Sequence, residues 1–108
     1  MRVFDVLKVV KVNHGDVYVQ QILMTDAAGK PNSVLTDLLR DVLSKIQMFV
    51  NLDEVHDVDE VIDILHSFTP LPDDVLDEYD KVLTQEVSAI NFATRKHEIE
   101  LVYDELVR

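Results

Sequence analysis

Carboxylates are the most abundant groups in this sequence that could do chemistry. The chain has 108 residues, with 21 acids, ten lysines and arginines and four histidines, and its net charge is −11. Residues 52–80 contain no lysine or arginine and carry eleven acids, namely Asp53, Glu54, Asp57, Asp59, Glu60, Asp63, Asp73, Asp74, Asp77, Glu78 and Asp80. The rest of the chain holds ten acids and ten bases, so this acidic segment accounts for the whole imbalance.

Carboxylate catalysis is the first hypothesis that such a composition raises. Two carboxyl groups in different environments can divide the roles of general acid and general base. That chemistry requires a concave, partly apolar pocket, which a domain of about 100 residues with short helices rarely provides. The acids here fall on the outward sides of amphipathic segments, so we predict a protein that is not an enzyme and has no catalytic residues.

The histidines offer a second kind of chemistry, the binding of a metal ion. None of them forms a His-Glu-x-x-His motif, which would place two imidazoles on one helical face. A weak divalent site is conceivable where a histidine and acids share a face, but dedicated sites need convergent ligands and a second shell. We therefore predict solvated side chains and no metal at His14, His56, His66 and His97, or at Asp59, Glu60 and Asp63 near them.

Nucleotide cofactors are excluded by the glycine content. Gly29 and Lys30 are followed by Pro31, where a phosphate-binding loop requires serine or threonine, and the earlier glycine of that motif is missing. Gly15 is the one other glycine, so no dinucleotide fingerprint can form. The sequence predicts no cofactor.

The charge distribution itself predicts the kind of partner. The negative electrostatic field of this segment repels nucleic-acid phosphates and anionic membranes and attracts basic protein surfaces. If the 29 residues were one helix, they would span about 44 Å with one charge per about 4 Å, close to the 3.4 Å per phosphate along one DNA strand. We expect all eleven acids to contact a basic partner, and a nucleic-acid mimic that inhibits a DNA- or RNA-handling protein is the most specific form of this hypothesis. Small acidic inhibitors from viruses and plasmids act in this way, and the likeness is one of size and charge only.

Two other readings remain open. The acidic segment can be a solubilising surface without a dedicated partner, because charge runs are usually solvated. The chain can also be a structural or assembly subunit that forms a homodimer or larger oligomer through sheet edges. Met48 and the region of Phe92 are candidate contacts in that case.

The secondary-structure pattern predicts an α+β fold in one domain, residues 1–108. Valine-rich residues 3–12 and the β-like residues 17–24 flank the turn sequence 13–16, which predicts an N-terminal hairpin. Residues 86–93 and 98–107 predict a closing hairpin, with a long C-terminal helix as the alternative. The expected order is ββαααββ, packed as a small two-layer domain.

Three helices are expected between the two hairpins. Apolar residues recur at helical spacing in residues 33–50, in residues 57–68 and from residue 73 to residue 83, with Val87 as a further candidate for the last stripe. Asn32 or Ser33 can cap the first helix, and Asp57 with Glu60 resembles a capping box for the second. Prolines and acids in residues 70–74 suit the start of the third.

The same composition predicts a cytoplasmic location. The chain has no cysteine, and Asp5, Lys8 and Lys11 interrupt the apolar stretch that a signal peptide requires. The longest segments without Asp, Glu, Lys or Arg are residues 17–25 and 64–72, nine residues each, against roughly 20 apolar residues needed to cross a bilayer.

Overall fold

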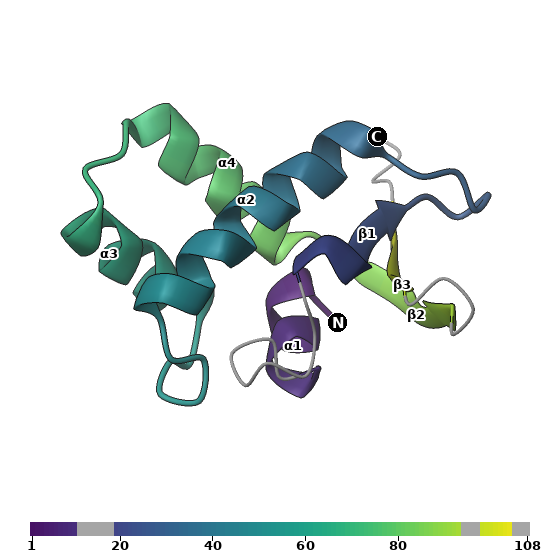
Figure 1. Ribbon diagram of the computed structural model, residues 1–108, viewed down its shortest axis with the longest axis horizontal. Helices are drawn as coiled ribbons and strands as arrows, with labels where there is room; N and C mark the ends of the chain where they lie inside the picture. Colours follow the sequence, from purple (N-terminus) through teal and green to yellow (C-terminus); the bar gives the residue numbers. More distant parts are fainter. Residues whose placement is uncertain (11–18, 94–97, 105–108) are drawn as a thin grey trace.

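The computed structural model describes residues 1–10, 19–93 and 98–104. In this part of the chain it contains four α-helices, one short 3₁₀ helix and three strands. Their order is α1 (Val3–Val9), η2 (Val19–Gln21), β1 (Ile22–Thr25), α2 (Ser33–Phe49), α3 (Val58–Phe68), α4 (Asp73–Thr84), β2 (Val87–Ala93) and β3 (Glu98–Tyr103). Figure 1 shows α3 and the sheet at opposite ends of the molecule, with α2 and α4 spanning the distance between them. The domain is small and compact, and its architecture is α+β.

The first element is a helix, so the predicted N-terminal hairpin is wrong. Val3, Phe4, Val6 and Leu7 are all buried, which is the spacing of one helical face rather than of a strand. The Asp5 carboxylate accepts a hydrogen bond from the backbone N–H of Arg2 and satisfies a donor at the start of the helix. Tertiary burial of this face overrides the β propensity of the valines. The expected turn at residues 13–16 lies outside the described residues.

The second half of the expected hairpin forms a strand with a different partner. β1 pairs in parallel with β3, with Ile22 opposite Ile99 and Met24 opposite Leu101. The strand order is β1-β3-β2, so the sheet is mixed. A parallel pair needs a long crossover connection, and here this connection contains α2, α3, α4 and β2.

Both C-terminal segments contain a strand, so the alternative of a long helix is wrong for residues 98–103, while residues 94–97 and 105–107 of the expected hairpin lie outside the described residues. β2 and β3 pair antiparallel, with Ile90 opposite Leu101 and Phe92 opposite Ile99. The register shifts between Val87 and Ala89, which is a local irregularity at the start of β2.

The three central helices form where the sequence predicts them, although α4 ends at Thr84 and Val87 belongs to β2, and their apolar stripes meet in one core. α2 packs against β1, α3 and α4, while α3 also packs against α4. The core side chains come from all four helices and the sheet, and the largest of them are Tyr79, Phe4, Leu7, Ile22, Met24, Leu39, Leu43, Ile46, Leu65, Leu83 and Leu101. Val34, which belongs to the apolar pattern of α2, is 76% exposed because it lies at the outward side of the first turn.

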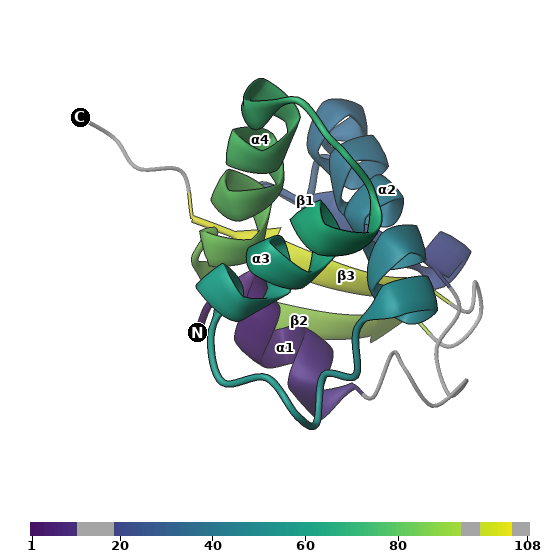
Figure 2. The ribbon, with the colours of Figure 1, turned by 90° about the vertical axis from the view of Figure 1, so that its left-hand side faces the viewer.

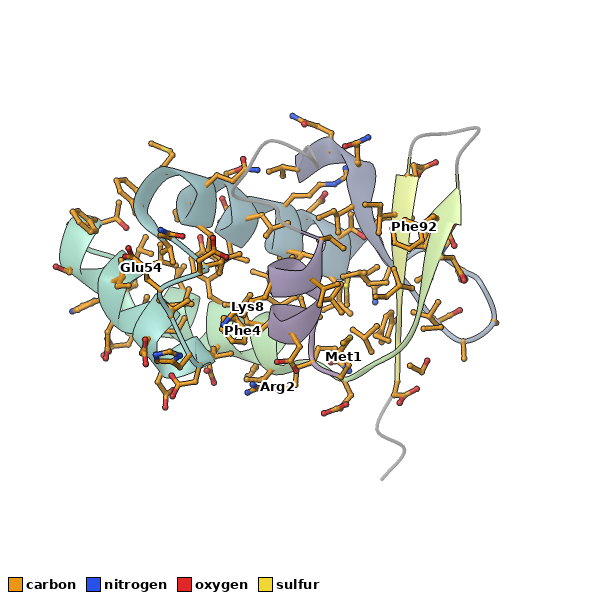
Figure 3. The ribbon with its side chains drawn as sticks, turned by 90° about the horizontal axis from the view of Figure 1, so that it is seen from below. Met1, Arg2, Phe4, Lys8, Glu54 and Phe92 are labelled. Atoms are coloured by element: carbon orange, nitrogen blue, oxygen red, sulfur yellow. The ribbon has the colours of Figure 1, made fainter. Side chains whose placement is uncertain are left out.

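Helix α1 is tied to the connection between α2 and α3. The Lys8 ammonium donates a hydrogen bond of 2.7 Å to the backbone carbonyl of Val55 and lies 5.6 Å from the centroid of the Phe4 ring. Figure 3 shows Lys8 and Glu54 on the same side of the molecule, where this connection passes α1.

Among the described helices, none combines the length and apolar character that crossing a membrane would require.

Candidate functional site

Helix α3 presents carboxylates on the side opposite its buried face. The Asp57 side chain accepts a hydrogen bond of 3.0 Å from the N–H of Glu60, so the predicted cap is present. The Glu60 carboxylate accepts from the N–H of His56 rather than from Asp57, so the reciprocal bond is displaced by one residue. Asp59 and Asp63 are four residues apart, which places them about 6 Å apart along the helix axis, and both are exposed.

Helix α4 repeats this arrangement. Pro72 occupies the position before its first turn, and Asp73 and Asp74 lie in that turn, where carboxylates interact favourably with the positive end of the helix. Its buried side chains are Leu76, Tyr79, Val82 and Leu83. Asp77 is exposed and Asp80 is partly buried on the remaining side.

The two helices enclose a groove of about 450 Å³ that is open to solvent. Its described lining consists of Asp59, Ile62 and Asp63 from α3 and Leu76, Asp77 and Asp80 from α4. We call it the acidic groove. Figure 2 shows α3 and α4 together on one side of the molecule, in front of the sheet. Four carboxylates and two aliphatic side chains thus line the groove, so the described lining residues are either acidic or apolar.

The other seven acids of the segment are not part of this groove. Asp53 and Glu54 lie in the connection before α3, while Asp57 and Glu60 are engaged at its first turn. Asp73 and Asp74 lie at the start of α4, and Glu78 forms an exposed ion pair of 3.7 Å with Lys81. The acidic segment therefore forms two short helices beside the acidic groove, and it is not one continuous anionic helix.

The groove has the chemistry of a binding site for cations on a flexible apolar stem. Lysine and arginine combine such a stem with a charged head, so the stem can cover Ile62 and Leu76 while the head reaches the carboxylates. Within residues 1–10, 19–93 and 98–104, no group of three or more histidines and acids is placed to hold a metal ion. Asp59, Asp63 and His66, which share a helix, do not form one.

Three features of the structure were not predicted from the sequence. Ile62 and Leu76 line the groove, whereas the pattern of apolar residues indicated only that they face inward. The rings of Phe49 and Phe68 stack with centroids 5.3 Å apart, and Phe68 remains 62% exposed. Tyr79 bonds to Asp41 on α2. Each depends on how two helices are placed relative to one another, and periodicity within one helix carries no signal for it.

The fold and the groove together define a small mixed α+β domain with a carboxylate-lined interhelical site. Comparisons with protein-family models, curated proteins and solved structures gave no significant match for this chain.

Proposed function

We propose that this protein is a small acidic binding protein that presents the α3–α4 surface to a positively charged surface of a partner protein. One observation carries the proposal: Asp59, Asp63, Asp77 and Asp80 line a single groove together with two aliphatic side chains, without a base among the described lining residues. Like charges at four-residue spacing on a helix destabilise it. A partner that supplies positive charge would offset this repulsion, which explains why the acids are placed in this way.

The affinity of such a complex has two sources. Charge attraction steers the partner toward the groove and weakens with salt, because mobile ions screen exposed charges over about 10 Å at 0.1 M ionic strength. Burial of lysine or arginine stems against Ile62 and Leu76 adds an apolar contribution that salt does not weaken. The charged contribution therefore dominates the salt dependence.

Mimicry of nucleic acid is the most specific form of this proposal. A protein that handles DNA or RNA has a basic groove with contacts at the spacing of phosphates. The carboxylates of Asp59 and Asp63 repeat at about 6 Å, and those of Asp77 and Asp80 at about 4.5 Å along the axis. The proposed inhibitor would occupy the basic groove and exclude the nucleic acid.

A capture experiment from nuclease-treated lysate tests the proposal. Immobilised protein is compared with a groove variant carrying Asp59→Asn, Asp63→Asn, Asp77→Asn and Asp80→Asn, at about 50 and about 500 mM salt. We expect basic proteins to be retained by the unaltered chain at low salt only, and to be lost by the groove variant. Release of a captured partner by added duplex DNA supports mimicry, whereas retention in its presence limits the proposal to a general basic surface.

A control variant with the same net charge removes four acids from other elements. Asp37→Asn, Glu98→Gln, Glu100→Gln and Asp104→Asn leave the groove intact, so this variant should capture the partner as the unaltered chain does. If no basic protein is captured, if salt has no effect on retention, or if the two variants lose capture equally, the proposal is wrong.

A further inference from the structure

Strand β2 is an edge of the sheet and carries no charge. It lies at the end of the order β1-β3-β2, and its residues Val87–Ala93 read VSAINFA. In an edge strand, the N–H and C=O groups of alternate residues point away from the sheet. Exposed edges normally carry lysine, proline or inward-pointing charges that prevent pairing with another chain. β2 contains none of these residues, so its backbone can accept a further strand.

The beginning of β2 already bonds to another segment at this edge. The N–H of Val87 donates to the carbonyl of Met1. The irregularity in the pairing of β2 with β3 lies at this same end, between Val87 and Ala89. Figure 3 shows Phe92 toward the other end of the strand, away from Met1. Residues 89–92 therefore form the regular stretch of the edge beyond the N-terminal residues.

One face of this stretch is apolar and incompletely covered. Ile90 lies opposite the core residue Leu101 of β3, so its side chain is on the face of the sheet that contributes to the core. Phe92 is two residues further along the strand and therefore on the same face. Ile90 is partly buried, but Phe92 is 64% exposed. This face therefore favours apolar side chains at alternate positions of an added strand, because they would cover the exposed ring.

The opposite face of the sheet is acidic. Asn91 lies opposite Glu100 of β3, and Glu98 is two residues before Glu100, so both carboxylates are on this face. Both glutamates are partly exposed, and within the described part of the chain neither forms an ion pair. Ala89 and Asn91, the β2 residues in front of them, are short and exposed. A strand added to β2 would lie about 9.5 Å from β3, so a lysine or arginine on it can extend over these short side chains toward the carboxylates.

The charge of the sheet selects a basic occupant for the edge. The three strands together contain the two glutamates of β3 and no lysine or arginine. Residues 86–104 as a whole have four acids and two bases, and both bases belong to the connection between β2 and β3. The net charge of the chain is −11, so an acidic strand is repelled and a basic one attracted.

We infer that β2 accepts an extended peptide in which basic and apolar residues alternate, added as a fourth strand beside residues 89–92. The peptide backbone bonds to the outward N–H and C=O groups of β2. Its basic side chains reach toward Glu98 and Glu100, and its apolar side chains cover Ile90 and Phe92. When a strand is added to a sheet edge, main-chain bonds give affinity and alternate side chains give specificity. The inference does not depend on the proposed function, because α3 lies at the opposite end of the molecule from the sheet (Figure 1) and no groove residue takes part.

Titration with a fluorescently labelled peptide that alternates lysine and valine tests the inference. A peptide of about eight residues has the usual length of a strand. We expect saturable binding by fluorescence anisotropy, weaker at about 500 mM than at about 50 mM salt. A peptide of the same composition, with its lysines in one block and its valines in another, has the same charge but cannot separate them onto two faces. It should bind at least about tenfold more weakly, and a peptide that alternates glutamate and valine should not bind.

Two double variants of equal charge distinguish the edge from the acidic groove. Glu98→Gln with Glu100→Gln removes the carboxylates beside the edge and should raise the dissociation constant of the alternating peptide at least about fivefold. Asp59→Asn with Asp63→Asn removes the same charge from the groove and should change it by less than about twofold.

A lysine placed on the edge itself gives a second test. In Asn91→Lys the new ammonium lies opposite Glu100, a favourable cross-strand pair, so the sheet should remain intact. The substitution should repel the basic peptide and raise its dissociation constant at least about fivefold. Met48→Lys adds the same charge to α2, at a side chain that is 73% exposed, and should leave peptide binding unchanged. Circular dichroism of every variant shows whether it is folded.

Amide hydrogen exchange identifies the backbone bonds. The N–H groups of residues 89–92 that point away from β3 should exchange more slowly when the peptide is bound. Absence of saturable binding, equal binding of the alternating and block peptides, or unchanged exchange in β2 overturns the inference. Equal losses in the Glu98/Glu100 and Asp59/Asp63 variants overturn it as well. Failure here leaves the proposed function standing, because capture of a partner by the acidic groove is lost in a different set of variants.

Discussion

The hydroxyl of Tyr79 donates a hydrogen bond to the carboxylate of Asp41 and joins α4 to α2. Tyr79 is 1% exposed, so its hydroxyl needs a partner within the protein. Lys45 completes the arrangement, with its ammonium 3.1 Å from the Asp41 carboxylate and 5.4 Å from the centroid of the Tyr79 ring. These three side chains hold α4 in the position that forms one wall of the acidic groove.

This contact makes stability depend on pH. Partial burial raises the pKa of the Asp41 carboxyl, but hydrogen bonds from Tyr79 and Lys45 outweigh it, so the pKa lies below its ordinary value of 3.8. A carboxyl whose folded pKa is lowered stabilises the fold above its unfolded pKa. That stabilisation is lost as pH falls through the folded pKa.

We therefore expect Tyr79→Phe to lower the free energy of unfolding at pH 7 by about 1 kcal/mol. The variant should also lose less of its free energy of unfolding than the unaltered chain does as the pH falls below 4. The urea midpoint at each pH measures this loss. Tyr103→Phe is the control, because the Tyr103 hydroxyl accepts a hydrogen bond from the side-chain amide of Asn32. An unchanged acid dependence in Tyr79→Phe would contradict the assignment.

Two buried threonines provide a matched pair of substitutions with opposite expected effects. The Thr25 hydroxyl has no hydrogen-bond partner in the described structure, whereas the Thr36 hydroxyl accepts a bond of 2.9 Å from the N–H of Met24. Thr25→Val removes an unsatisfied polar atom and should raise the free energy of unfolding by about 1 kcal/mol. Thr36→Val leaves a buried N–H unpaired and should lower it by about 1–3 kcal/mol. Chemical denaturation measures both, and equal signs would contradict the prediction.

Shortening the side chain of Asp57 tests its role as the cap of α3. Asp57→Ala removes the acceptor for the N–H of Glu60 and should cost about 1 kcal/mol of the free energy of unfolding. Asp37→Ala removes the same charge from an exposed position of α2 outside its first turn and should change stability by less than about 0.5 kcal/mol. A similar loss in both variants would mean that charge, and not the cap, explains the effect.

The acidic groove should lower the stability of the free protein. Asp59 and Asp63 are a like-charge pair at four-residue spacing, so Asp63→Asn should raise the free energy of unfolding by about 0.2–0.5 kcal/mol at low salt. The gain should disappear in about 1 M salt, where the screening length is about 3 Å. Thermal unfolding at both salt concentrations measures it. A gain that persists at high salt would indicate that Asp63 destabilises the fold by some means other than charge.

The parts of the fold that follow from local pattern were predictable. The apolar stripes of α2, α3 and α4 and the caps at Asn32 and Asp57 each depend on residues within one or two helical turns. The N-terminal segment was mistaken for a strand because valine favours strands, and only the packing of Val3 to Leu7 against the core shows otherwise. The pairing of β1 with β3 joins residues almost eighty positions apart, for which a single sequence contains no signal.

The candidate site was predictable in composition and not in shape. The absence of bases in residues 52–80 identified the acids, and the helical pattern placed them on outward faces. Which four of them share a groove depends on the placement of α3 relative to α4, and the Tyr79 contact with Asp41 contributes to that placement.

The position of β3 between β1 and β2 has a consequence for synthesis on the ribosome. Ile22, Leu23 and Met24 leave the exit tunnel long before the segment that pairs with them. Helices α2, α3 and α4 are synthesised before β3, and the sheet closes only when β3 has emerged. A nascent chain of this protein therefore carries an unpaired apolar strand for most of its elongation, which is the interval in which chaperones and aggregation compete.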